Sequence, residues 1–309
     1  FLLALLTGRK GELSTQADVD LSEAGVYHIL AVSGMHCAYL LALVGFLTGK
    51  HRRRLTAAAA IPVLIFYAAL TGASPSVVRA CVMLSFLTAA PLFRRESDPP
   101  TAMLTALFLI LVNNPFAVKS VSLQLSFGAV AGILLVSDRV QDAMIDFFHL
   151  DRPRKSLVVR LALAVPRFLV ATLSATLGAS VLTVPLAALH FGLVSLVSPL
   201  SNLLTLWAVA GLFLGGLCVG LVACVLPGPA AVLAFPFTLL GHYLNWVVQS
   251  LGRMPLAALP LNSFYYKAWV VYLCLLLALA ALVRGQKGWI IPGCAAVTAL
   301  TACFWFTAL

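Results

Sequence analysis

Continuous apolar runs recur along this chain, and they restrict its fold more than any other feature. Residues 25–47, GVYHILAVSGMHCAYLLALVGFL, form one such run. A helix of about 20 apolar residues crosses the hydrocarbon core of a bilayer. The runs are uninterrupted, whereas the strands of a membrane β-barrel alternate apolar and polar side chains. We therefore predict an all-α fold, that of a polytopic helical membrane protein.

The composition excludes a soluble globular domain. Of the 309 residues, 62% are hydrophobic and only 10% are charged, and the mean hydropathy is +1.04. The seven cysteines lie inside apolar runs without a CxxC pair, so we interpret them as small hydrophobic residues. We expect no cofactor and no metal site. The chain starts with Phe1 inside an apolar run, so we expect a domain of a longer protein.

The runs predict about ten spans in a single transmembrane domain over residues 1–309. The spans are 26–48, 55–71, 76–93, 100–113, 119–136, 157–184, 199–226, 229–250, 265–283 and 289–309. Residues 8–24 are polar and predicted to lie outside the cytoplasm. Residues 138–160 predict an amphipathic interfacial helix on the cytoplasmic side. An uncharged linker is expected over 184–198.

The positions of lysine and arginine test this topology. Cytoplasmic loops of membrane proteins are enriched in both residues. With the GKHRRR loop placed in the cytoplasm, thirteen of the 20 cations fall on the cytoplasmic side and six on the other. Arg167 lies within a span. Because topology explains much of the net charge of +10, that charge alone does not indicate nucleic-acid binding.

Three polar residues and a glycine interrupt the first span: His28, Ser33, His36 and Gly34. Ionisable side chains inside a spanning segment are functional candidates by default. On an unbroken helix the two histidines would lie about 80° apart, and Ser33 can contact His36 three residues later. Gly34 permits a helix break or a close neighbour. The alternative is that the histidines only bond neighbouring helices.

The segment TGASPSVVRA contains the second polar group. Ser74 followed by Pro75 predicts a helix start, with serine as the cap. Ser76 and Arg79 then fall near the helix N-terminus, where the macrodipole disfavours a cation. An anion such as phosphate would compensate it. The alternative is an arginine that extends to the membrane surface.

Two further segments place polar residues inside apolar runs. Gln124 and Ser126 lie in the fifth span, either bonding another helix or lining a pore. His190 precedes Ser198-Pro199, which repeats the Ser-Pro helix start and is followed by Asn202. The two Ser-Pro starts suggest broken or re-entrant helices around one cavity. Two ordinary helix caps remain the alternative.

Together these four segments resemble the ComEC competence family. The matching stretches are HILAVSGMHCAYL, TGASPSVVRACVM, SLQLSFGAVAGI and HFGLVSLVSPLSNLL, in that order. Cys37 stands where the family often has Val, and Leu123 where it often has Phe. The resemblance implies a channel that moves single-stranded DNA across the bacterial cytoplasmic (inner) membrane during natural transformation.

The resemblance also implies partners beyond the DNA and the lipid bilayer. Because the sequence has no Walker motif, we expect a cytoplasmic ATP-driven motor, together with DNA-receptor and other competence proteins. A homo-oligomer is a further expectation. The OB-like and metallo-β-lactamase-like domains of full-length relatives are absent from this sequence. We therefore expect no enzymatic activity.

We assign the polar residues of the four segments to the DNA pathway. They are His28, Ser33, His36, Ser74, Ser76, Arg79, Gln124, Ser126, His190, Ser198 and Asn202. Gly34, Pro75 and Pro199 are the predicted hinges. Two other functions remain open. One is a secondary transporter for a small anionic solute, and the other is a membrane-embedded hydrolase that uses Ser33 and His36.

Overall fold

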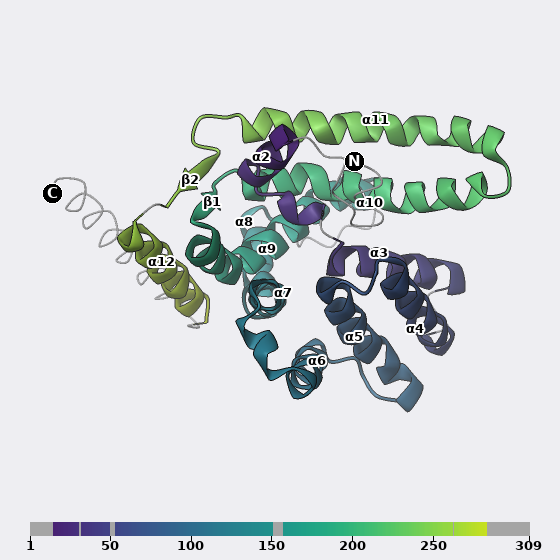
Figure 1. The fold of residues 1–309 in the computed structure, drawn as a ribbon, viewed down its shortest axis with the longest axis horizontal. Coiled ribbons are helices and arrows are strands. Elements are labelled where there is room, and N and C mark those ends of the chain that lie inside the picture. The colour runs from purple at the N-terminus through teal and green to yellow at the C-terminus, as the bar shows by residue number, and fades with distance from the viewer. Residues whose placement is uncertain (1–14, 31, 50–52, 151–156, 262, 283–309) are drawn as a thin grey trace. The chain divides into compact units, whose positions relative to one another are not determined.

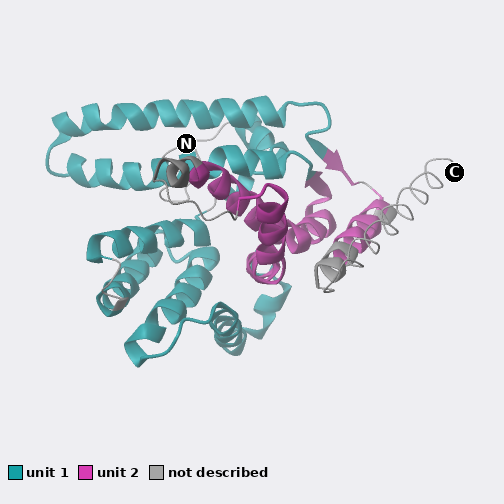
Figure 2. Ribbon diagram, turned by 180° about the vertical axis from the view of Figure 1, so that it is seen from behind, with its two compact units in different colours: residues 1–123, 195–258 teal, residues 124–194, 259–309 magenta. Residues whose placement is uncertain are grey.

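The computed structural model describes residues 15–30, 32–49, 53–150, 157–261 and 263–282 (Figure 1). It confirms the all-α polytopic fold, because these residues include five helices long and apolar enough to cross a membrane and four shorter apolar ones. The predicted span 289–309 lies outside the described residues. The chain divides into two compact units, residues 1–123 with 195–258 (unit 1) and residues 124–194 with 259–309 (unit 2) (Figure 2).

Unit 1 contains most of the helices. In chain order they are α2 (Thr15–Glu23), the 3₁₀ turn η1 (Tyr27–Ile29), α3 (Gly34–Thr48), α4 (Arg53–Leu70), α5 (Pro75–Ala89), η2 (Ala90–Phe93), α6 (Pro99–Asn113), η3 (Pro115–Lys119), α10 (Ser198–Ala223) and α11 (Pro227–Gly252). Helices α3, α4 and α5 pack on one another, and α10 packs on α3 and α11. The hairpin of α10 and α11 is visible in Figure 1.

Unit 2 is built around one long helix. Its helices are most of α7 (Val121–Gly132), the π turn η4 (Ile133–Ser137), α8 (Asp138–Phe147), α9 (Leu157–Phe191) and α12 (Phe264–Leu282). The strands β1 (Leu193–Ser195) and β2 (Ala258–Pro260) form a two-stranded sheet. Helix α9 contacts η4, α8 and α12. Gly132 and Gly178 meet backbone to backbone where η4 crosses α9, as small residues do at membrane helix crossings.

The core of unit 1 centres on Phe213 of α10, which is fully buried. The rings of His36 and Tyr67 meet it edge-on, with centroids 4.9 and 5.8 Å away. Other large apolar side chains point outward, among them Phe46 with 82% of its surface exposed and Phe66 with 69%. Apolar side chains this exposed suit a lipid environment rather than water.

The predicted span 26–48 is not one helix. Ser33 has an extended backbone, with φ −133° and ψ 177°, and α3 starts only at Gly34. Tyr27–Ile29 form a separate 3₁₀ turn. The angle of about 80° between His28 and His36 assumed an unbroken helix, so the prediction that they share one helical face is wrong.

The predicted linker 184–198 is shorter than expected. Helix α9 continues to Phe191 and contains both Pro166 and Pro185. It ends where Gly192 takes a left-handed φ of +65°, a conformation that glycine adopts readily. A proline inside a membrane helix is tolerated because neighbouring groups compensate for the lost backbone bond, so Pro185 does not end this helix.

Helix α8 lies within the predicted amphipathic segment 138–160. It follows α7 and η4 without a break, since residues 121–147 form one helical stretch. Residues 151–156 lie outside the described residues. The position of α8 at the cytoplasmic membrane surface stays a prediction.

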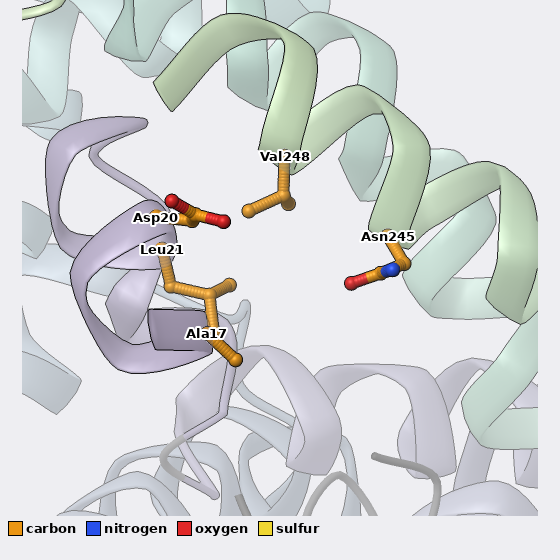
Figure 3. A pocket seen from close by; sticks show the side chains of 5 residues that line it. All are labelled: Ala17, Asp20, Leu21, Asn245 and Val248. Carbon is orange, nitrogen blue, oxygen red and sulfur yellow. The ribbon is translucent and has the colours of Figure 1, made fainter. Parts of the chain in front are cut away.

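Helix α2, in the polar segment 8–24, is fixed to the end of α11. Asp20, with 3% of its side chain exposed, pairs with Arg253 at 3.0 Å. Gln16 donates a second hydrogen bond to the same carboxylate at 3.0 Å. The backbones of Gly252 and Asp20 are in close contact, with no room for a Cβ on the glycine. Figure 3 shows Asp20 beside a small cavity that Asn245 also lines.

We predict that the substitution Asp20→Asn destabilises unit 1 by about 1 kcal/mol at neutral pH. The expected loss of stability is modest because Arg253 is 56% exposed, and exposed ion pairs contribute little to the free energy of unfolding. The Arg253 hydrogen bond holds the pKa of Asp20 below its ordinary value. The pair therefore contributes stability at pH values above the unfolded pKa of about 4. That contribution is lost as the pH falls through the lowered native pKa.

Thermal melting of the purified protein between pH 7 and pH 2.5 measures this effect. The wild-type advantage in Tm over Asp20→Asn should disappear at the acidic end. The matched control is Asp18→Asn, since Asp18 makes no ion pair with any residue that the structure describes and its Oδ1 has no hydrogen-bond partner among them. Equal destabilisation by the two substitutions would show that net charge, rather than this pair, matters.

Candidate functional site

Ser33 and His36 close the start of α3. The Ser33 N–H donates to Nδ1 of His36 at 3.2 Å, and the His36 N–H donates to the Ser33 carbonyl at 3.1 Å. This exchange resembles a capping box, in which the third helical residue bonds back to the cap. The Ser33 hydroxyl lies 3.4 Å from the same Nδ1. Because the backbone already occupies this nitrogen, the geometry does not favour His36 as a base that activates Ser33.

The His36 ring is completely buried inside unit 1. Since Nδ1 accepts a backbone N–H, the proton of the neutral ring belongs on Nε2. Nε2 is buried and has no hydrogen-bond partner. A buried donor without an acceptor costs free energy, so His36 is held in place by the helix start and by Phe213 rather than by this nitrogen. Its place on a DNA pathway stays a prediction.

His28 and Gly34 lie on either side of the break before α3. His28 is in η1, and its side chain is exposed. A Cβ on Gly34 would lie 3.4 Å from Cβ of Ala80, so the glycine lets α3 approach α5 next to Arg79. The structure thus gives Gly34 a packing role, while its role as a hinge stays a prediction.

The predicted helix start at Ser74-Pro75 is confirmed, since α5 begins at Pro75. Ser74 occupies the predicted N-cap position, but its side chain makes no capping hydrogen bond. Proline favours this start, because its fixed φ suits the first helical position and the N–H it lacks would have no partner within the helix. Ser74 and Ser76 are both half-buried.

Arg79 is buried in unit 1 without a carboxylate partner. Only 4% of its surface is exposed. One terminal nitrogen donates to the carbonyl and the hydroxyl of Ser122, at 2.9 and 2.8 Å, whereas Nε is buried with no hydrogen-bond partner. Within the described ranges Asp20–Arg253 is the only ion pair. Arg79 is therefore a buried cation whose charge is not neutralised, an expensive arrangement.

The second Ser-Pro start contacts the segment before η1. Helix α10 begins at Ser198, so Pro199 is its second residue rather than its first. The Ser198 hydroxyl donates to the carbonyl of Gly25 at 3.3 Å, so Ser198 bonds another segment rather than capping its own helix. Asn202 is 8% exposed, and its Oδ1 has no hydrogen-bond partner.

Gln124 and His190 come together in unit 2. His190 Nε2 lies 2.8 Å from Gln124 Oε1, across 66 residues of sequence. His190 is exposed at the end of α9, whereas Gln124 and Ser126 on α7 are half-buried. The structure thus joins the third and fourth polar segments through one hydrogen bond.

Sequence reasoning did not assign functions to two residues that matter here. Ser122 bonds Arg79, and its position two residues before Gln124 was the available signal. Gly25 has a φ of +72°, and a Cβ there would lie 2.6 Å from Cβ of Ser198. A single glycine before an apolar run gives no sign of such a contact.

This fold, an apolar core with a few ionisable and polar side chains buried among its helices, defines a polytopic helical membrane protein. The competence protein family model matches residues 5–286, and the chain belongs to this family. It is also similar to ComE operon protein 3 of Bacillus subtilis (strain 168), with 31% identity over 144 residues. That match covers 45% of this chain and 18% of the relative. No solved structure matches the chain.

We predict that His36→Leu destabilises the protein more than His36→Gln does. Leucine leaves the Ser33 N–H without its acceptor, at a cost of about 1–3 kcal/mol. Glutamine is a usual residue at this position of a capping box and can accept the same bond. Thermal melting of both variants in one detergent gives the comparison. Equal Tm values would show that the ring serves only as filler beside Phe213.

Proposed function

We propose that this chain forms the path by which single-stranded DNA crosses the bacterial cytoplasmic membrane during natural transformation. Membership of the competence protein family and the four motifs support this proposal. The observation on which it chiefly depends is Arg79, a buried arginine with one partnerless nitrogen and no carboxylate. A protein gains nothing in stability from such a group, so we attribute it to ligand binding.

A phosphodiester group suits Arg79. Guanidinium groups bind phosphate oxygens through two parallel hydrogen bonds. Ser122 occupies one terminal nitrogen of Arg79. Nε and the second terminal nitrogen lie on either side of that nitrogen, so each can donate to a phosphate oxygen of its own, and a two-bond contact with one phosphate requires displacement of Ser122. Movement of the strand brings one phosphate after another to this contact.

The other groups of the proposed path are mostly uncharged. Many cations would hold the strand through phosphate contacts that accumulate, whereas hydroxyl, amide and imidazole groups let it move. Bases stack on aromatic rings without regard to sequence. Tyr27 and Phe191 expose 39% and 64% of their surfaces, and we assign base stacking to the more exposed ring, that of Phe191. Phe127 is buried, and the Tyr39 hydroxyl donates to the Leu206 carbonyl.

The proposal includes partners. A cytoplasmic ATP-driven motor supplies the energy, and DNA-receptor and other competence proteins deliver the strand. Assembly of several copies is part of the same proposal. The proposal assigns no catalytic step to this chain.

The test replaces Arg79 in a transformable host that depends on this chain. We expect Arg79→Gln to lower the amount of internalised labelled DNA at least tenfold while protein levels stay normal. We also expect its Tm to equal or exceed that of the wild type, because a neutral side chain removes an unpaired buried charge. Arg79→Lys should retain part of the uptake, since it keeps the charge but loses the paired donors.

Arg139→Gln is the matched control, because Arg139 is exposed on α8 and donates only to the carbonyl of Leu135. It should leave both uptake and Tm unchanged. Normal uptake by Arg79→Gln would contradict the role of this residue. Stabilisation of the protein by small anions but not by oligonucleotides would favour the transporter of anionic solutes instead.

A further inference from the structure

The turn at Gly192 directly follows an exposed phenylalanine and a hydrogen-bonded histidine, and a lysine side chain of α12 lies against it. We propose that Lys267, Phe191, His190 and Gln124 form a nucleotide-binding site for single-stranded DNA, which we name the Gly192 site. In this site the Lys267 ammonium binds a phosphate and the Phe191 ring stacks on a base. The inference rests on the proposed DNA path and adds a second phosphate contact, in unit 2, to that of Arg79 in unit 1.

Gly192 creates the geometry of this site. Its left-handed φ of +65° ends α9, and its carbonyl accepts the Leu261 N–H at 2.7 Å. A Cβ on Gly192 would lie 3.6 Å from Nζ of Lys267 and 3.7 Å from its Cε. The ammonium group therefore lies against the backbone turn that directly follows His190 and Phe191.

Lys267 has no anion to neutralise it. It lies in the first turn of α12, where the macrodipole disfavours a cation. No acidic side chain forms an ion pair with it among the residues that the structure describes. The carbonyl groups at the C-terminal end of a helix such as α9 carry only partial negative charge, so they offset the charge of the ammonium only in part. A phosphate beside the Gly192 turn would neutralise the ammonium fully.

The two residues before Gly192 supply the contacts for a base. Phe191 exposes 64% of its surface at the last position of α9, and stacking on such a ring contributes about 1–3 kcal/mol per base. The His190 Nε2–H donates to Gln124 Oε1 at 2.8 Å in the neutral ring, which leaves Nδ1 as an acceptor for a base edge. The base contacts thus directly precede the Gly192 turn, against which the Lys267 ammonium lies.

Binding of a fluorescent oligo(dT) of about 20 nucleotides to the purified chain in detergent, measured over a range of salt concentrations, tests the site. Loss of one phosphate contact on a single strand lowers the slope of log K against log salt by about 0.7. We expect this change for Lys267→Gln, with roughly threefold to tenfold weaker binding, and recovery of both values in Lys267→Arg. Phe191→Leu should weaken binding about fivefold or more without changing the slope.

Lys119→Gln is the matched control, because it removes the same charge from an exposed residue of η3 and should bind as the wild type does. If Lys267→Gln keeps the wild-type slope of log K against log salt and lowers only the Tm, Lys267 serves to stabilise the C-terminal end of α9 through its helix dipole. That result would overturn the site. A wild-type slope with loss of stabilisation by phosphatidylglycerol would assign Lys267 to a lipid headgroup and overturn the site equally.

These results are separate from those for the DNA path itself. If Arg79→Gln abolishes uptake while Lys267→Gln keeps the wild-type slope, the path stands and the Gly192 site does not. If the unaltered chain binds no oligonucleotide and cells that carry Arg79→Gln take up DNA normally, both proposals are wrong.

Discussion

Backbone groups inside a bilayer have no water to bond, so every interruption of a helix needs another partner. Three interruptions in this chain show how side chains and neighbouring backbone meet that need. Before α3 the ring of His36 accepts the Ser33 N–H. After α9 the Gly192 carbonyl accepts the N–H of Leu261. Before α10 the Ser195 hydroxyl donates to the carbonyl of Glu23 at 2.7 Å. Several polar side chains in the apolar runs therefore hold the places where a helix begins or ends.

Some buried polar atoms of unit 1 remain unpaired after these bonds are made. They include Nε2 of His36, Nε of Arg79 and Oδ1 of Asn202. Two are donors and one is an acceptor, and each belongs to one of the four motif segments. A nucleic acid strand offers phosphate oxygens to the donors, and its base edges offer both kinds of partner. The same segments therefore fix the helix ends and leave a few groups unsatisfied, the combination expected where structure and ligand binding share one sequence.

Local contacts could be predicted from the sequence, and distant ones could not. The start of α5 at Pro75 and the contact of Ser33 with His36 follow from residues three or fewer positions apart. Gly34 indicated either a helix break or a close neighbour, and the structure shows both a helix that starts at Gly34 and a close approach to Ala80; the sequence did not decide between them. The bond between Gln124 and His190 spans 66 residues and the pair of Asp20 with Arg253 spans 233. Such pairs depend on how helices pack, which periodicity within one segment does not specify.

The turn at Gly25 has a consequence for how this chain can vary in evolution. Its carbonyl accepts a hydrogen bond from Ser198, 173 residues away, and its Cα leaves no room for a side chain beside Ser195 and Ser198. Alanine at 198 would not relieve the crowding, because the contacts are with Cβ of Ser198 and with Cβ and Oγ of Ser195, and the left-handed backbone also disfavours any other residue at 25. Substitutions at 195 and 198 are therefore constrained by a glycine in a distant segment. The two segments are therefore coupled in this fold, because a change at either one alters the packing or the hydrogen bonding of the other.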